Sequence, residues 1–307
     1  MYCDVLKGSS NEMNVSLLIK LYEEGNRNFA GVDLRCADLS GVSLIGVNLS
    51  GANLMGANLS RAILTKADLS RANLNWANLT FAKLGSAKFV DADLTKANLL
   101  GAFMLKCKLP GAKLSGATLT AVNLRQGNLR EANLCSAFLQ RINLREANLS
   151  GVNFNWANLF EARLSGAMLH GATFYGANFS RAFLRELDLS GEDLQGVKLN
   201  QSRMGGANLE GANLVAADLR EAHLRLVNFK GADLTGANLS RAFFDRTNLT
   251  WTNLTKADLS DTNLTQAMLK GANVAGAELN GTILPEDIKL CDRSQKAVDA
   301  IALPLAQ

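Results

Sequence analysis

The chain has 307 residues, 26 of them Gly and only 3 Pro, and its 32 Lys and Arg against 28 Asp and Glu give a formal net charge of +4. No stretch approaches the roughly 20 consecutive apolar residues of a membrane-spanning helix, so we expect a soluble protein. The first twelve residues lack the basic start and apolar run of a signal peptide, which makes a cytoplasmic location the default expectation.

Residues 1–28 form an extension without repeats. Asn14 can cap a helix that runs through VSLLIKLYEE, and Gly25 is a typical stop after it. We expect this helix to cover the end of the structure that follows. The sequence leaves open whether translation starts at Met1 or at Met13.

A five-residue repeat fills residues 29–284 without one insertion or deletion. Reading every fifth residue from Phe29 gives 52 centre positions, of which 42 are Leu and the others Phe, Met or Val. Two residues before each centre lies mostly Ala, and the residue between them is mostly Asn or Asp. Positions two apart share one face of an extended chain, so Ala and Leu point inward together while Asn or Asp points outward.

A period of five matches neither a helix nor a continuous strand, which indicates short extended segments joined by corners. The backbone groups of such a coil can be paired only by the coils above and below it. The A-(D/N)-L-x-x pattern resembles the pentapeptide-repeat family over about five sixths of the chain. The resemblance implies an all-β solenoid, a right-handed quadrilateral β-helix with four repeats per coil, and therefore about 13 coils. MNVSLLIKLYEEGNRNFAGVDL also resembles the short helical opening of cyanobacterial members.

Residues 285–307 form a C-terminal tail in which residues 294–303 can form one short amphipathic helix. In related proteins the last coil is often a dimer contact, so the tail either covers that end or decorates it. Monomer and homodimer through the C-terminal end both remain open.

Catalytic chemistry is not indicated. The two histidines, His170 and His223, lie near no Cys or paired carboxylate at ligand spacing, so we expect no catalytic residue, no metal and no cofactor. The five cysteines are odd in number, scattered and without a C-x-x-C pair, which predicts free thiols with Cys107 as a small core residue. They are Cys3, Cys36, Cys107, Cys135 and Cys291.

One side of the expected solenoid departs from the repeat. Residues whose numbers differ by twenty share a side, and the side centred on Leu44, Leu64 and Leu84 has lost many of its outward Asn and Asp residues. With its corners it carries eleven basic and four acidic residues, a formal +7 against +4 for the whole chain. Arginines interleaved with exposed aromatic residues are typical of binding surfaces. The candidate interaction surface comprises Lys83, Phe103, Arg125, Arg141, Arg145, Arg163, Arg181, Phe183, Arg185, Arg203, His223, Arg225 and Phe243.

The alternative is that Arg and Phe only stack on a solvated wall, as cross-strand neighbours do. A separate anomaly lies at Glu192 and Ser202, which occupy inward positions where Ala is usual. A buried carboxylate without a partner is costly, so we expect an irregular coil that turns Glu192 outward or pairs it with Arg203 or Lys198.

These features favour a non-catalytic regulatory scaffold that binds a protein partner, and an acidic partner suits the basic side. The resemblance also implies an alternative, because the quinolone-resistance branch of the family binds a topoisomerase as a DNA mimic. That branch uses an acidic surface, whereas this chain is net positive and has no loop between repeats. Direct nucleic-acid binding is disfavoured by a net charge of only +4, and a purely structural role remains a further alternative.

Overall fold

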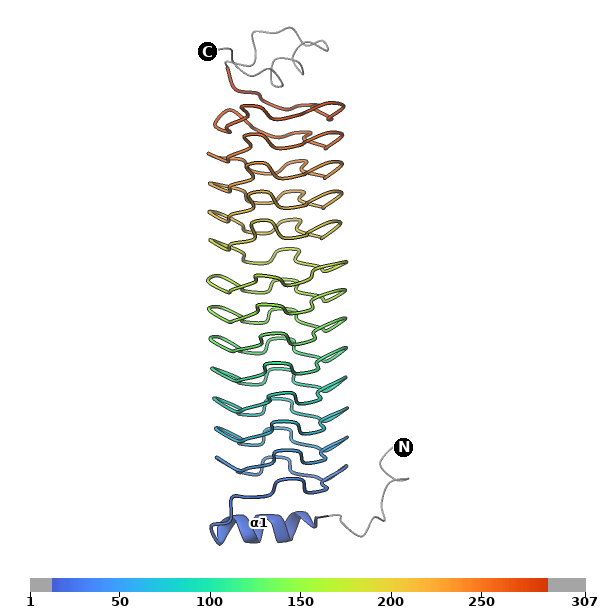
Figure 1. Cartoon of the computed structure of the whole chain (residues 1–307), viewed down its shortest axis with the longest axis vertical. Coiled ribbons are helices and arrows are strands. Elements are labelled where there is room, and N and C mark those ends of the chain that lie inside the picture. Colours follow the sequence, from blue (N-terminus) through green and yellow to red (C-terminus); the bar gives the residue numbers. More distant parts are fainter. Residues whose placement is uncertain (1–12, 287–307) are drawn as a thin grey trace. The chain divides into compact units, whose positions relative to one another are not determined.

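A computed structural model describes residues 13–286 of the chain. The chain divides into two compact units, Met1–Asn158 and Leu159–Gln307, each of which is a stack of coils (Figure 1). The described residues contain one helix, α1 (Val15–Glu23), and their β structure consists of single bridged residues rather than longer strands. No helix among them is long and apolar enough to cross a membrane.

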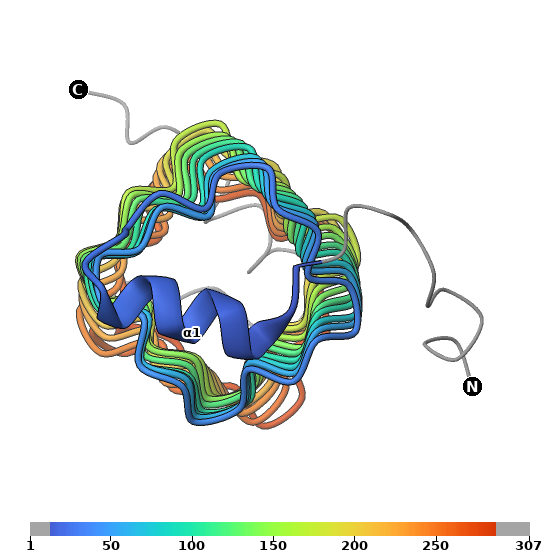
Figure 2. The ribbon, with the colours of Figure 1, turned by 90° about the horizontal axis from the view of Figure 1, so that it is seen from below.

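Helix α1 lies across the first coil of the first unit (Figure 2). The Asn14 side chain accepts a hydrogen bond from the Ser16 N–H at 2.8 Å and so caps the helix. Leu18 is fully buried, and the Tyr22 hydroxyl donates to the Ile45 carbonyl at 3.0 Å. The helix therefore covers apolar surface that the first coil would otherwise expose to water.

Each coil contains twenty residues and four sides. The bridges join residues exactly one coil apart, as in Asn28↔Asn48 and Asp33↔Asn53, and they recur every five residues along the chain. All of them are parallel, which is the pairing that successive coils of a solenoid require. Figure 2 shows the four-sided outline of the coils.

The repeat satisfies all five of its backbone N–H groups. In the repeat centred on Leu49, backbone carbonyls accept from Asn48, Leu49, Gly51 and Ala52, at 2.7 to 3.0 Å. The fifth N–H, that of Ser50, donates to the Asn48 side-chain oxygen at 3.0 Å. An outward Asn or Asp is therefore part of the backbone hydrogen-bonding scheme, because its side chain accepts from the N–H two residues on.

The inward Leu and Ala side chains form the core and are almost all fully buried. At several positions a polar residue replaces the inward Ala and donates to a carbonyl of the neighbouring coil. Cys107 Sγ donates to the Leu84 carbonyl at 2.9 Å, and Thr247 Oγ1 donates to the Leu224 carbonyl at 2.8 Å. Burial raises the pKa of the Cys107 thiol to about 12, so this side chain remains a neutral donor.

The corners hold residues with positive φ, and many of these residues are not glycine. Several bulky corner residues have glycine at the equivalent position of the next coil. A Cβ built on Gly101 would lie 2.5 Å from the Phe81 ring, and one built on Gly271 would overlap the Trp251 ring. Glycine at these corners accommodates the aromatic ring from the preceding coil.

Two expectations from the sequence concern the cysteines and the C-terminal tail. Cys36 is disulfide-bonded, so the prediction of five free thiols is wrong for this residue, whereas Cys107 and Cys135 are free. Leu279 and Leu284 are only partly buried in the last described coil. The proposed tail helix at residues 294–303 lies outside the described residues.

Candidate interaction surface

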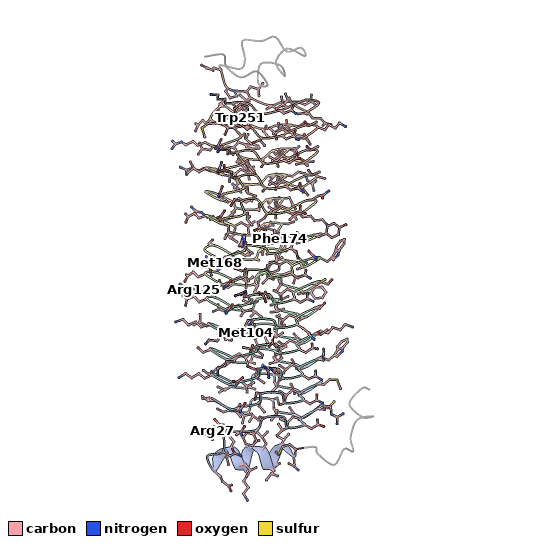
Figure 3. The ribbon with its side chains drawn as sticks, in the orientation of Figure 1. Arg27, Met104, Arg125, Met168, Phe174 and Trp251 are labelled. Carbon is pink, nitrogen blue, oxygen red and sulfur yellow. The ribbon has the colours of Figure 1, made fainter. Side chains whose placement is uncertain are left out.

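The outward residues of the basic side form an in-register column in each unit. In the first unit the bridges connect Ser43, Ile63, Lys83, Phe103, Asn123 and Asn143. In the second unit they connect Arg163, Phe183, Arg203, His223 and Phe243. Figure 3 shows the side chains of both units and labels Arg125, which is exposed, and Met104, which is fully buried.

The loss of Asn and Asp from this column leaves backbone donors free. Gly85 follows Lys83 by two residues, and Leu105 follows Phe103 by two. Within residues 13–286 no protein atom accepts a hydrogen bond from either backbone N–H. The same holds for the N–H groups of Ile45, Thr65, Arg185, Gly205, Arg225 and Asp245. The basic side thus presents unused donors in successive coils, while the other sides lose at most two acceptors in a row within a unit.

In the second unit, cations and aromatic rings stack on one another. The Phe183 ring lies between two guanidinium groups, 5.8 Å from Arg163 and 4.8 Å from Arg203. The imidazole of His223 stacks on the Phe243 ring at 4.8 Å, with 12° between the ring planes. Cation–π contacts at exposed sites contribute about 0.5–1 kcal/mol each, so the column holds its side chains in defined positions without a large gain in stability.

Carboxylates of neighbouring coils pair with part of the positive charge. Arg125 Nη2 lies 2.7 Å from Glu146 Oε1, and hydrogen bonds from Gln126 and Arg125 lower the pKa of Glu146 below its usual value. Three further pairs on this side are Arg181 with Glu161 at 3.3 Å, Arg225 with Asp245 at 3.0 Å, and Arg241 with Asp261 at 3.5 Å. The formal +7 therefore overstates the uncompensated charge.

Several cations on this side form no salt bridge among residues 13–286: Arg61, Lys83, Arg145, Arg163, Arg185 and Arg203. All of them are exposed. Arg141 is also exposed, at a corner with positive φ. The structure thus places every residue of the candidate surface on the same side of its own unit.

Exposed apolar residues accompany the cations in the first unit. Phe81, Leu100, Phe103 and Leu105 are 51%, 37%, 57% and 41% exposed and belong to two neighbouring coils. Ile45 lies on the same side and is 48% exposed. Leu100, Leu105 and Ile45 were not singled out from the sequence, because an apolar residue at a corner gives no signal until the coil assigns it to a side.

Other exposed aromatic residues lie outside this side. Trp76 and Trp156 occupy equivalent corners of the first unit, and Trp251 occupies a corner of the second unit (Figure 3). The Lys96 ammonium lies 4.6 Å from the centre of the Trp76 ring. These residues are spread over several corners, so they do not form a second continuous surface within a unit.

Glu192 interrupts the hydrogen-bond ladder of the second unit. Its Oε1 accepts from the Gly171 N–H at 3.0 Å, where the regular pattern would use the Ser190 carbonyl, and it lies 3.7 Å from His170 Nδ1. Within the second unit's described residues no bridge joins Met168 to Asp188. The coil is irregular at Glu192, as expected. Of the two expected alternatives, pairing with Arg203 or Lys198 is wrong, because the carboxylate binds the Gly171 N–H of the preceding coil instead.

Ser202, the other irregular inward residue, is fully buried. Its hydroxyl oxygen has no hydrogen-bond partner, unlike the threonines that replace Ala elsewhere in the second unit. Met168 and Phe174, labelled in Figure 3, belong to the coil that faces Glu192. We place no binding role on this irregular coil.

The described residues contain no group of three or more His, Cys, Asp or Glu side chains that could hold a metal ion. The His223 ring stacks on Phe243, whereas His170 lies off the basic side, beside Glu192. The geometry of the basic side suits binding through donors, cations and aromatic rings.

Comparison with known proteins identifies the repeat. The family model for pentapeptide repeats matches eight times, and together the matches run from residue 28 to residue 284 and leave out only Gly127 and Glu192. The eight segments are 28–61, 52–89, 87–126, 128–166, 157–191, 193–231, 212–250 and 247–284. No curated protein sequence matches the chain.

Several solved structures are similar to the chain. HetL, a pentapeptide repeat protein involved in heterocyst differentiation regulation from the cyanobacterium Nostoc sp. strain PCC 7120, is 29% identical over 90% of this chain and 98% of its own, with a TM-score of 0.30. Rfr23 from the cyanobacterium Cyanothece 51142 is 25% identical over 44% of this chain and 89% of its own, with a TM-score of 0.28. QnrB1, a plasmid-mediated fluoroquinolone resistance protein, is 22% identical over 53% of this chain and 91% of its own, with a TM-score of 0.29. At these TM-scores no functional argument rests on the likenesses.

Proposed function

The chain belongs to the pentapeptide-repeat family, and we propose that it serves as a non-catalytic scaffold that binds a protein partner through its basic side. Members of this family form right-handed quadrilateral β-helices and are generally structural or binding proteins. The repeat specifies the core and the backbone ladder, so the identity of a partner has to be encoded where the outward residues depart from the repeat.

One observation carries the proposal. On the basic side the outward Asn and Asp are replaced in successive coils. No atom of residues 13–286 therefore accepts from the N–H groups of Gly85 and Leu105 in the first unit, or of Arg185 and Gly205 in the second. Each lost side-chain hydrogen bond removes about 0.5–1.5 kcal/mol of stabilisation. A side with a purely structural role would gain nothing from this loss. On a surface that binds the carboxylates and carbonyls of a partner, the freed N–H groups serve as hydrogen-bond donors.

The same observation weighs against the alternatives. A DNA mimic presents carboxylates, whereas this side presents cations and N–H donors. Nucleic-acid binding is disfavoured by the net charge of only +4 for the whole chain. An acidic protein is the partner that suits the basic side.

Three finer features accompany this proposal. The unbroken register of 52 repeats, at four per coil, corresponds to about 13 coils. The oligomeric state that accompanies the proposal is a monomer or a homodimer through the C-terminal end. The cytoplasm is the default location, whereas a disulfide at Cys36 is typical of an oxidising compartment, so the thiol state of Cys36 in the native cell decides between them.

The scaffold proposal is tested by capture from a lysate of cells that naturally contain the protein. The bait is the full chain, and the test variant carries Arg163→Glu and Arg203→Glu, which reverse both cations beside Phe183. The matched control carries Lys198→Glu and Lys256→Glu, two exposed cations of the second unit that lie off the basic side. Circular dichroism first establishes that all three proteins are folded.

We expect the wild type and the control to capture the same protein and the test variant to lose it. Equal capture by all three proteins would remove the basic side of the second unit from the proposal. Loss in the control as well would show that the effect depends only on net charge.

A further inference from the structure

The basic side of the first unit contains a stretch without any carboxylate. We define the docking face as the outward and corner residues of five successive coils, residues 40–46, 60–66, 80–86, 100–106 and 120–126. These segments contain no Asp or Glu and five exposed cations, namely Arg61, Lys66, Lys83, Lys106 and Arg125. Only Arg125 has an ion pair among the described residues, with Glu146 of the next coil.

The same face exposes apolar side chains that lie close together. Phe81, Leu100, Phe103 and Leu105 belong to two neighbouring coils, and each is more than a third exposed. The Phe81 ring packs over Gly101, and Gly101 lies between Leu100 and Phe103 in the sequence. Scattered exposed apolar residues are ordinary in a folded protein, whereas a contiguous apolar patch ringed by polar groups marks an interaction site.

Unused backbone donors complete the chemistry of the docking face. The N–H groups of Ile45, Thr65, Gly85 and Leu105 have no acceptor within the described part of the chain. The face therefore offers cations, N–H donors and apolar side chains, but no acidic side chain. A partner surface that complements the docking face presents carboxylates beside an apolar stripe.

The backbone of the docking face excludes the addition of a strand. The Lys83 N–H donates to the Ala62 carbonyl at 2.9 Å, and the Leu84 N–H donates to the Phe103 carbonyl at 2.8 Å. The coils thus pair with one another and offer no free sheet edge to an extended peptide. A helix satisfies its own backbone, so it can bind to such a wall through side chains alone.

The spacing of the coils also suits a helix. Successive coils are ~4.8 Å apart and one turn of an α-helix rises 5.4 Å, so a helix along the stack meets about one coil per turn. From Ile45 through Ile63 and Phe81 to Phe103 the apolar residues cross three coil spacings, ~14 Å, which corresponds to about ten helical residues. We infer that this face docks an acidic amphipathic helix of the partner protein. The inference rests on the proposed scaffold function and specifies the partner's chemistry.

Single-stranded nucleic acid fits the face less well. Its bases bind proteins by stacking on aromatic rings. The exposed apolar set contains the aliphatic residues Ile45, Leu100 and Leu105, and one face of the Phe81 ring already covers Gly101. Aliphatic side chains suit the Leu, Ile and Val residues of an amphipathic helix instead.

Two designed peptides of 18 residues test the inference. Both are helical and carry the same Leu stripe, flanked by Glu in the first peptide and by Lys in the second. Their binding to the full chain is measured by fluorescence anisotropy, together with that of an 18-nucleotide oligo(dT). The test variant is Phe103→Ser with Leu105→Ser, and the matched control is Trp76→Ser with Phe138→Ser, which removes two exposed aromatic residues from other sides of the first unit.

We expect the Glu peptide to bind at least about tenfold more tightly than the Lys peptide, and the test variant to weaken it by about tenfold or more, because central apolar residues dominate interface energies. The control variant should bind like the wild type. Equal binding of both peptides, or an unchanged affinity in the test variant, would overturn the inference. If the oligonucleotide binds more tightly than the Glu peptide and the test variant abolishes that binding, nucleic acid is the occupant and the inference is overturned.

The result is separable from that of the capture experiment. Capture that depends on Arg163 and Arg203 while neither peptide binds would remove only this docking face. Peptide binding as expected, without any captured protein, would leave the docking chemistry in place and remove the scaffold proposal for the second unit.

Discussion

The role given to the outward Asn predicts that one substitution on the basic side stabilises the protein. In Lys83→Asn the new side-chain oxygen can accept from the Gly85 N–H, which has no acceptor among the described residues. Lys83 makes no ion pair within that range, so nothing comparable is lost. A neutral hydrogen bond contributes about 0.5–1.5 kcal/mol, and we expect the free energy of unfolding to rise by about 1 kcal/mol.

The reverse substitution on an adjoining side is the matched control. Asn78 accepts from the Thr80 N–H at 3.2 Å and donates to Asn58 at 3.2 Å. Asn78→Lys loses both bonds, so we expect a loss of about 1–2 kcal/mol. Urea denaturation followed by circular dichroism measures both variants. If Lys83→Asn destabilises the protein as much as Asn78→Lys does, the reasoning about the side-chain acceptor is refuted.

Three further predictions concern the corners, the irregular coil and a buried thiol. Gly101→Ala should be less stable than Gly41→Ala by about 1 kcal/mol, because both have positive φ but only Gly101 meets the Phe81 ring; equal urea midpoints would contradict this. Glu192→Ala should increase amide protection against hydrogen exchange in residues 164–176, because Ala is the usual inward residue and leaves the Gly171 N–H free to bond the next coil. Unchanged exchange would contradict this prediction. The Cys107 thiol, whose pKa burial raises to about 12, should resist alkylation at pH 8 until the protein unfolds, and rapid modification of the folded protein by iodoacetamide would disprove its burial.

The family and the coarse fold follow from the sequence because the repeat is governed by local rules. The alternation of Ala, Asn or Asp, and Leu requires one inward and one outward face, and the pentapeptide-repeat identification is confirmed by the eight matches. The sequence also located the anomaly at Glu192. Its contact with Gly171 could not be derived, because a side chain twenty-one residues away in sequence becomes a neighbour only once the coils are stacked.

Features that depend on contacts between coils were not predictable. Asn and Asp were interpreted as a polar ladder, but their hydrogen bond to the N–H two residues on appears only with the turn geometry. The ring of Trp251 fits at its corner because Gly271 lies at the equivalent position of the next coil. Cys36 was predicted to be free because sequence spacing does not show which thiols meet in space.

Residues on the candidate surface were found by their numbering modulo twenty, which is a property of the coil. The sequence pointed to Phe103, Phe183 and Arg203, and the structure stacks Arg203 on Phe183. It did not reveal that Arg225 is paired with Asp245 of the next coil. Formal charge along a side is therefore a weaker guide to binding than the cations that remain unpaired.

The most direct test of the basic side as a binding surface uses a photo-crosslinking amino acid in place of single outward residues. It is placed at position 103 or 183 on the basic side, and at Lys198 as the control on another side, and the proteins are irradiated in cells that naturally contain the partner. We predict a crosslinked protein at 103 or 183 and none at 198. A crosslink of equal yield at 198, or none at 103 and 183, would contradict the account.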